Sequence, residues 1–86
     1  MTTTEKKEMM EDILAIFSAF IAEYFDGIDP FQIEPETALN DIGDDPKTLQ
    51  EVIAELFAFY KVEKDKETFQ TVGDLIQSVA NQLEDN

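Results

Sequence analysis

The side chains that could carry chemistry in this chain are almost all carboxylates. The 86 residues include 20 Asp and Glu against six lysines, and neither histidine nor cysteine occurs. Histidine is the usual general base and metal ligand, and cysteine is required for thiolate nucleophiles, disulfides and zinc–sulfur sites. An enzyme would therefore need two carboxylates in a cleft, and no pair stands out by its spacing. We expect no catalytic residue, and hence no enzyme.

One acidic run, Asp41-Ile42-Gly43-Asp44-Asp45, could suggest a bound cation. The calcium loop of an EF-hand alternates acidic residues, keeps a glycine at its sixth position and ends on a glutamate at its twelfth. That order does not follow here. We therefore expect no dedicated metal site and no cofactor.

The net charge of -14 narrows the classes of partner. Such a field repels the phosphates of nucleic acids and anionic lipid surfaces, and it attracts basic proteins. No apolar run approaches the roughly 20 residues that span a bilayer. The first residues also lack the basic-then-apolar order of a signal peptide. The expectation is a soluble, cytoplasmic, monomeric protein that binds neither nucleic acid nor membrane.

The elements that must position any site are predicted to be helices. Residues 4–25 repeat apolar side chains at steps of three and four, which predicts an amphipathic helix. Asp26-Gly27 then stops it, because glycine readily adopts the left-handed conformation that closes a helix. The predicted inner face of this first helix consists of Met10, Ile13, Leu14, Phe17, Phe20, Ile21 and Tyr24.

The sequence of residues 27–45 predicts a long loop. Because this loop contains many apolar side chains besides its two prolines, we expect it to pack on the core. These apolar residues are Ile28, Phe31, Ile33, Leu39 and Ile42. A second helix should run from Pro46 to about Lys61, with Asp45 as its N-cap. Its predicted inner face is Leu49, Val52, Ile53, Leu56, Phe57 and Tyr60.

Residues 64–69 leave room for one short helix. Thr71 to Asp74 resembles a capping box, and a last helix should follow it. Its predicted inner face is Val72, Leu75, Ile76, Val79 and Leu83. No segment shows the alternation of a β-strand. We predict a single all-α domain over residues 1–86, a bundle of three main helices plus one short helix with a long first loop.

Three stretches of this layout resemble the acyl carrier protein family, and together they extend the likeness over nearly the whole chain. Residues 27–36 resemble the turn after a carrier protein's first helix, and residues 39–45 resemble the approach to its attachment site. Residues 71–76 resemble the start of the family's last helix. The resemblance implies a phosphopantetheine-carrier fold.

The chain departs from the family at the residue that carries the cofactor. Where carrier proteins have Asp-Ser-Leu, this chain has Asp45-Pro46-Lys47. In the family the serine hydroxyl is esterified to 4'-phosphopantetheine, and proline has no hydroxyl. Thr48 lies two residues on, so it would face roughly 200° away around the helix. We therefore expect no phosphopantetheine, although Thr48 stays a conceivable alternative acceptor.

The resemblance also implies where a partner would bind. Carrier proteins present an acidic second helix to basic patches on partner enzymes. For this chain the resemblance implies an enzyme of fatty-acid, polyketide or lipid metabolism as the partner. Lys47 interrupts that acidic pattern, and Phe59 falls outside the apolar stripe of its helix. The predicted partner-binding residues are Asp44, Asp45, Lys47, Glu51, Glu55 and Phe59.

An alternative function is the non-covalent binding of a fatty acyl chain within the helical bundle. The family's interior admits acyl chains, and this chain has nine aromatic residues that could line a pocket. The same rings could instead fill the core, each burying roughly 150–250 Å². The sequence leaves both interpretations open. The aromatic residues are Phe17, Phe20, Tyr24, Phe25, Phe31, Phe57, Phe59, Tyr60 and Phe69.

Overall fold

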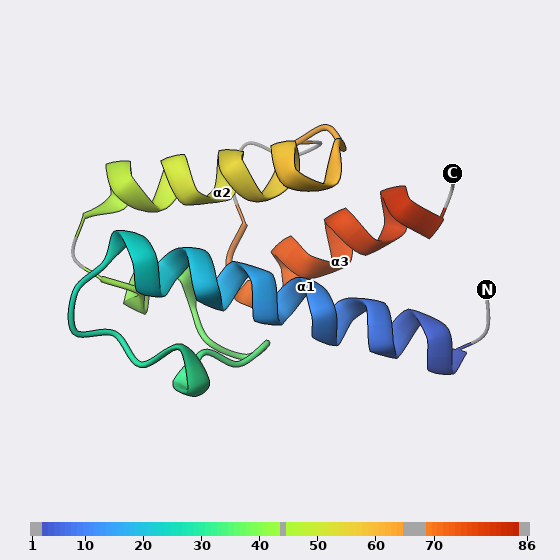
Figure 1. The fold of residues 1–86 in the computed structure, drawn as a ribbon, viewed down its shortest axis with the longest axis horizontal. Coiled ribbons are helices and arrows are strands. Elements are labelled where there is room, and N and C mark those ends of the chain that lie inside the picture. Colours follow the sequence, from blue (N-terminus) through green and yellow to red (C-terminus); the bar gives the residue numbers. More distant parts are fainter. Residues whose placement is uncertain (1–2, 44, 65–68, 85–86) are drawn as a thin grey trace.

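The computed structural model describes residues 3–43, 45–64 and 69–84, and these form an all-α bundle (Figure 1). The three main helices are α1 (Thr3–Tyr24), α2 (Pro46–Tyr60) and α3 (Val72–Glu84). Two 3-10 turns, η1 (Pro30–Gln32) and η2 (Leu39–Asp41), interrupt the loop between α1 and α2. The predicted architecture of three main helices and a long first loop is confirmed. Four of the six positions predicted for a short helix, 65–68, lie outside the described residues.

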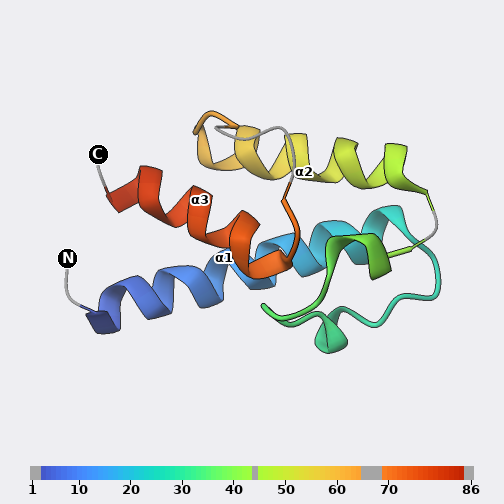
Figure 2. The same cartoon turned by 180° about the vertical axis from the view of Figure 1, so that it is seen from behind.

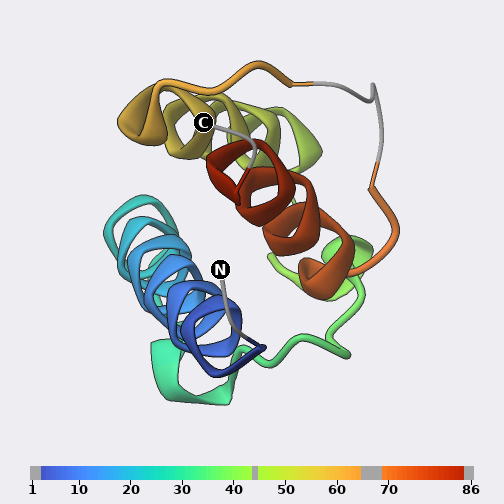
Figure 3. The same ribbon diagram turned by 90° about the vertical axis from the view of Figure 1, so that its right-hand side faces the viewer.

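Viewed end-on, the three helices surround one hydrophobic core (Figure 3). The stripes predicted from the sequence supply it: Ile13, Phe17 and Ile21 of α1 are fully buried. Within α2, the buried residues are Leu49, Val52, Ile53, Leu56 and Phe57. Within α3, the predicted Val72, Leu75, Ile76 and Val79 are buried, whereas Leu83 near its end is half-buried. Burial of these side chains is the main source of the fold's stability.

Tyr24 does not occupy the inner face predicted for it, since 37% of its surface is exposed. The helix ends at this residue, and the next side chain, Phe25, turns into the core instead. Gly27 follows with a φ of +85°, so the predicted glycine stop is confirmed. Tyr24 therefore lies at the edge between α1 and α2, where its hydroxyl is close to Glu55.

The long loop is fixed on the core as predicted, through the buried side chains of Ile33, Leu39 and Ile42. Phe31 is an exception, because 93% of it is exposed. Side chains three residues apart lie on the same side of a 3-10 turn, so Pro30 and Ile33 share the inward side of η1 and Phe31 projects outward. Asp29 holds this turn by accepting a hydrogen bond from the Phe31 amide at 2.9 Å.

The loop is also tied to the start of α3, as Figure 2 shows from behind. The amide of Leu39 donates to the carbonyl of Gln70 at 3.0 Å, and that of Val72 donates to Thr37 at 2.9 Å. The amide of Gly73 donates to the carbonyl of Pro35 at 2.8 Å. A Cβ at Gly73 would lie 3.0 Å from that carbonyl oxygen, so the close approach of the two segments depends on a glycine there.

Candidate docking surface on the second helix

The start of α2 is built as its sequence predicts. Asp45 has extended backbone and accepts hydrogen bonds from the amides of Lys47 (3.1 Å) and Thr48 (3.4 Å). Pro46 is the first helical residue, a position at which a backbone N–H would have no partner within the helix. The predicted helix start and N-cap are confirmed, and the predicted site residue Asp44 lies outside the described residues.

The first hydroxyl group after Pro46 belongs to Thr48. Pro46 has none, and the Thr48 hydroxyl donates to the Asp45 carboxylate at 2.8 Å. Three hydrogen bonds from Lys47 and Thr48 thus converge on Asp45. These hydrogen bonds lower the pKa of the Asp45 carboxyl, and the bond from the Thr48 hydroxyl makes the largest contribution. Ser18 and Ser78, the chain's two serines, are both buried within α1 and α3.

Four of the predicted site residues form one continuous line along α2. Lys47, Glu51, Glu55 and Phe59 are each four residues apart, and all four are exposed. Residues at that spacing are neighbours on the surface of an α-helix. We call this line the α2 ridge. Asp45 lies at the end of the helix, where it serves as the cap.

The middle of the α2 ridge faces Tyr24 of α1. Hydrogen bonding of the Tyr24 phenol to the Glu55 carboxylate is the largest cause that raises the pKa of Tyr24 to about 12. Partial desolvation and the negative charges of Glu55, Glu23 and Glu51 act in the same direction. Glu23 therefore joins Glu51 and Glu55 in one acidic patch, which spans both helices.

The far end of the α2 ridge is aromatic. Phe59 is 56% exposed, which confirms the prediction that it lies outside the packed stripe of its helix. Its ring meets the half-buried Phe20 edge-on, with centroids 5.9 Å apart, and Tyr60 edge-on at 5.1 Å. Burial is the main cause that raises the pKa of Tyr60, and the negative charge of Asp12 raises it further. An aromatic patch thus adjoins the acidic one.

These contacts follow from the antiparallel packing of α1 and α2 (Figure 1). Moving four residues forward in α1, from Phe20 to Tyr24, corresponds to moving four residues back in α2, from Phe59 to Glu55. Four of the residues predicted from the sequence lie on the α2 side of this candidate surface. Glu23 and Tyr24 are not among the predicted partner-binding residues, because their position next to α2 depends on how the two helices pack.

Within the described residues, no group of three or more acidic side chains is placed to hold a metal ion. None of the described helices is both long and apolar enough to cross a membrane. Comparisons with models of protein families, with curated proteins and with solved structures returned no match. The resemblance to acyl carrier proteins stays a prediction from the sequence.

Proposed function

We propose that this chain is an acyl-carrier-protein-like binding module that does not carry phosphopantetheine and instead docks onto a basic surface of another protein. The observation that carries the proposal is the α2 ridge. Its exposed charged and aromatic side chains line the helix that begins at Pro46, where a carrier protein would have its serine. By the same resemblance, the partner is an enzyme of fatty-acid, polyketide or lipid metabolism.

Charge supports this proposal. The molecule's net charge of -14 would speed its encounter with a basic surface at low salt. Glu51 and Glu55 repel each other across one helical turn, and a bound cationic side chain would relieve that repulsion. Lys47 and Phe59, at the two ends of the α2 ridge, would contribute specificity by repelling or contacting particular partner groups.

Phe59 supports a docking function in a second way. A large exposed aromatic side chain beside half-buried rings offers apolar area next to a charged surface. Interfaces of this kind commonly derive much of their affinity from a few aromatic residues surrounded by polar ones. The interior gives less support to an acyl chain inside the bundle, because Phe17 and the residues around it are fully buried.

The test is binding to purified enzymes of fatty-acid and polyketide synthesis that recognise carrier proteins, measured by NMR titration at several salt concentrations. The variant Glu51→Lys/Glu55→Lys should weaken binding at least about tenfold. Glu34→Lys/Glu36→Lys changes the net charge equally at exposed loop positions and serves as the matched control. Phe59→Ala should also weaken binding, whereas Phe31→Ala should not.

Two outcomes would count against the docking proposal. If both double variants weaken binding equally, the association reflects overall charge and not the α2 ridge. If none of these enzymes perturbs the amide signals of Lys47, Glu51, Glu55 or Phe59, the proposed class of partner is wrong.

A further inference from the structure

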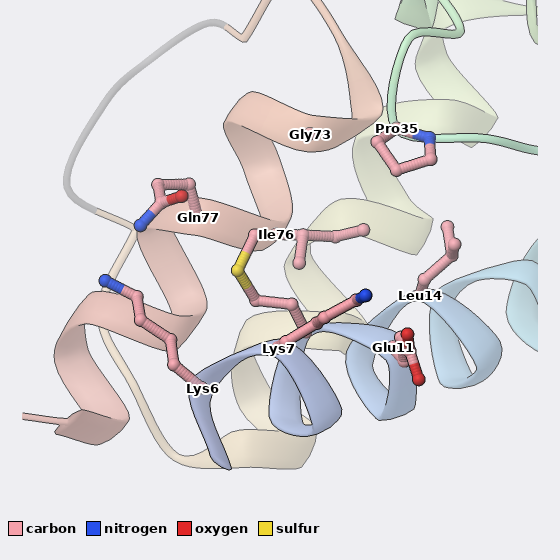
Figure 4. Close-up of a pocket in the computed structure, with 9 residues that line it drawn as sticks. Lys6, Lys7, Glu11, Leu14, Pro35, Gly73, Ile76 and Gln77 are labelled. Atoms are coloured by element: carbon pink, nitrogen blue, oxygen red, sulfur yellow. The ribbon is translucent and has the colours of Figure 1, made fainter. Parts of the chain in front are cut away.

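An apolar groove lies between α1 and α3, away from the α2 ridge (Figure 4). Its volume is about 500 Å³, within the range of sites that bind small molecules. Met10 and Leu14 of α1 and Ile76 of α3 form the apolar walls, and Pro35 of the long loop closes one end. Pro35 is held there by its hydrogen bond from Gly73.

The charge around this groove is less negative than that of the molecule as a whole. Two of the chain's six lysines, Lys6 and Lys7, lie along it with one acidic residue, Glu11. Because Glu84 pairs with Lys6 at 3.0 Å, the formal charge around the groove is about zero in a protein whose net charge is -14. An apolar surface bordered by ammonium groups fits a ligand with an alkyl chain and an anionic head.

The two lysines differ in what they already bind. Lys6 is ion-paired with Glu84 at 3.0 Å and donates a hydrogen bond to Asn81 at 3.1 Å, and these contacts join the start of α1 to the end of α3. Lys7 is exposed, and no ion pair is formed by it among residues 3–43, 45–64 and 69–84. Lys7 is thus the cation available to an anionic head group.

A second cavity, of about 400 Å³, lies further along α1. It shares Leu14 with the groove and lies against Ala15, Ser18 and the η1 turn. From Lys7 to Ala19 the helix rises about 18 Å, since each residue adds about 1.5 Å. That length accommodates an extended alkyl chain of a dozen or more carbons whose head remains at Lys7.

We propose that this α1/α3 groove binds the anion of a long-chain fatty acid, with its alkyl chain along Met10, Leu14 and Ile76 and its carboxylate at Lys7. The site lies on the surface and not inside the bundle. The site involves no residue of the α2 ridge, so the proposal of fatty-acid binding is independent of the proposed docking function.

The test uses dodecanoate as the probe and follows the methyl signals of Met10, Leu14 and Ile76 by NMR. Dodecanoate should shift these signals, and dodecyltrimethylammonium, which the net charge attracts, should shift them less. Shortening the chain to hexanoate should weaken binding, by roughly threefold to fourfold for each methylene removed. The opposite preference between the two head groups would overturn the proposal.

Charge variants then locate the head group. Lys7→Glu should weaken dodecanoate binding about fivefold or more. Lys61→Glu changes the net charge equally at an exposed position beyond α2 and should change the affinity less than about twofold. Equal weakening by both variants would overturn the assignment of the head group to Lys7. The absence of any shift at about 1 mM dodecanoate would overturn the site itself.

Discussion

The hydroxyl of Thr48 donates to the carboxylate of Asp45 at 2.8 Å, across the first turn of α2. This bond joins the helix cap to the nearest hydroxyl group after Pro46. The same carboxylate accepts from two backbone amides, so the helix start and the side chain of Thr48 are held by one acceptor. The bond therefore fixes the orientation of the Thr48 side chain.

We therefore predict that the protein gains no mass when incubated with coenzyme A and a phosphopantetheinyl transferase of broad specificity. Pro46 provides no oxygen, and Thr48 lies two residues on, roughly 200° away around the helix. Intact-mass spectrometry makes the measurement, and a serine-bearing carrier protein is the positive control. A gain of one phosphopantetheine, lost in Thr48→Val, would show that Thr48 is the attachment site.

The N-cap should make stability depend on pH in the acid range. Because hydrogen bonds lower the pKa of Asp45 in the folded state, its charged form stabilises the fold above its unfolded pKa near 4. This contribution is lost as the pH falls through the lower folded pKa. Asp45→Asn keeps a good capping residue without the charge. The stability difference between wild type and Asp45→Asn, measured by urea unfolding, should shrink on acidification; a constant difference would contradict the prediction.

Gly43 should tolerate substitution less well than Gly27. Both have positive φ, +65° and +85°, which strains any residue with a Cβ. A Cβ at Gly43 would also lie 2.5 Å from the ring of Phe25, whereas one at Gly27 would meet nothing within 4 Å. We expect Gly27→Ala to cost roughly 1 kcal/mol of unfolding free energy and Gly43→Ala roughly 3 kcal/mol.

A variant of Phe25 separates the two causes of the expected loss of stability at Gly43, which are backbone strain and the clash with the Phe25 ring. In Phe25→Leu, which removes the ring, the cost of Gly43→Ala should fall toward that of Gly27→Ala, as a double-mutant cycle from chemical denaturation would reveal. An unchanged cost would mean that backbone strain, and not the ring, decides the effect.

Tyr24 should titrate well above a free tyrosine. Its pKa is raised from 10.0 to about 12, chiefly by the hydrogen bond to Glu55. A raised pKa in the folded state means that stability from this contact is present below pH 10 and lost as the pH rises toward 12. Tyrosinate absorbance, compared with that of Tyr24→Phe, isolates this residue from Tyr60.

Two carboxylate variants test the cause of that shift. Glu55→Gln removes the charge and weakens the hydrogen bond, so it should lower the pKa of Tyr24 more than Glu51→Gln, whose contribution is the smallest. If Glu51→Gln has the larger effect, the Tyr24–Glu55 hydrogen bond is not the main cause.

The elements of the fold could be predicted because short-range rules fix them. An aspartate before a proline determines the start of α2, and apolar side chains at helical spacing determine which faces of the helices are buried. The exposure of Phe59 could be predicted for the same reason, since it depends on its position around a single helix.

The remaining features depend on how distant segments meet. Nothing local places Tyr24 against Glu55, because that pair exists only once α1 and α2 are packed antiparallel. The outward direction of Phe31 follows from a 3-10 turn that its apolar character does not indicate. The α1/α3 groove likewise requires Pro35 to reach Gly73 across a separation of 38 residues.

The hydrogen bonds between the first loop and the start of α3 make the conformation of the loop depend on a distant segment of the chain. The partners of Pro35, Thr37 and Leu39 are all found at residues 70–73, so each bond closes a chain segment longer than α2 itself. Closing such a segment costs entropy before any contact compensates for it. These hydrogen bonds of the loop between α1 and α2 therefore form only when the start of α3 lies against it, although the loop precedes α2 in the chain.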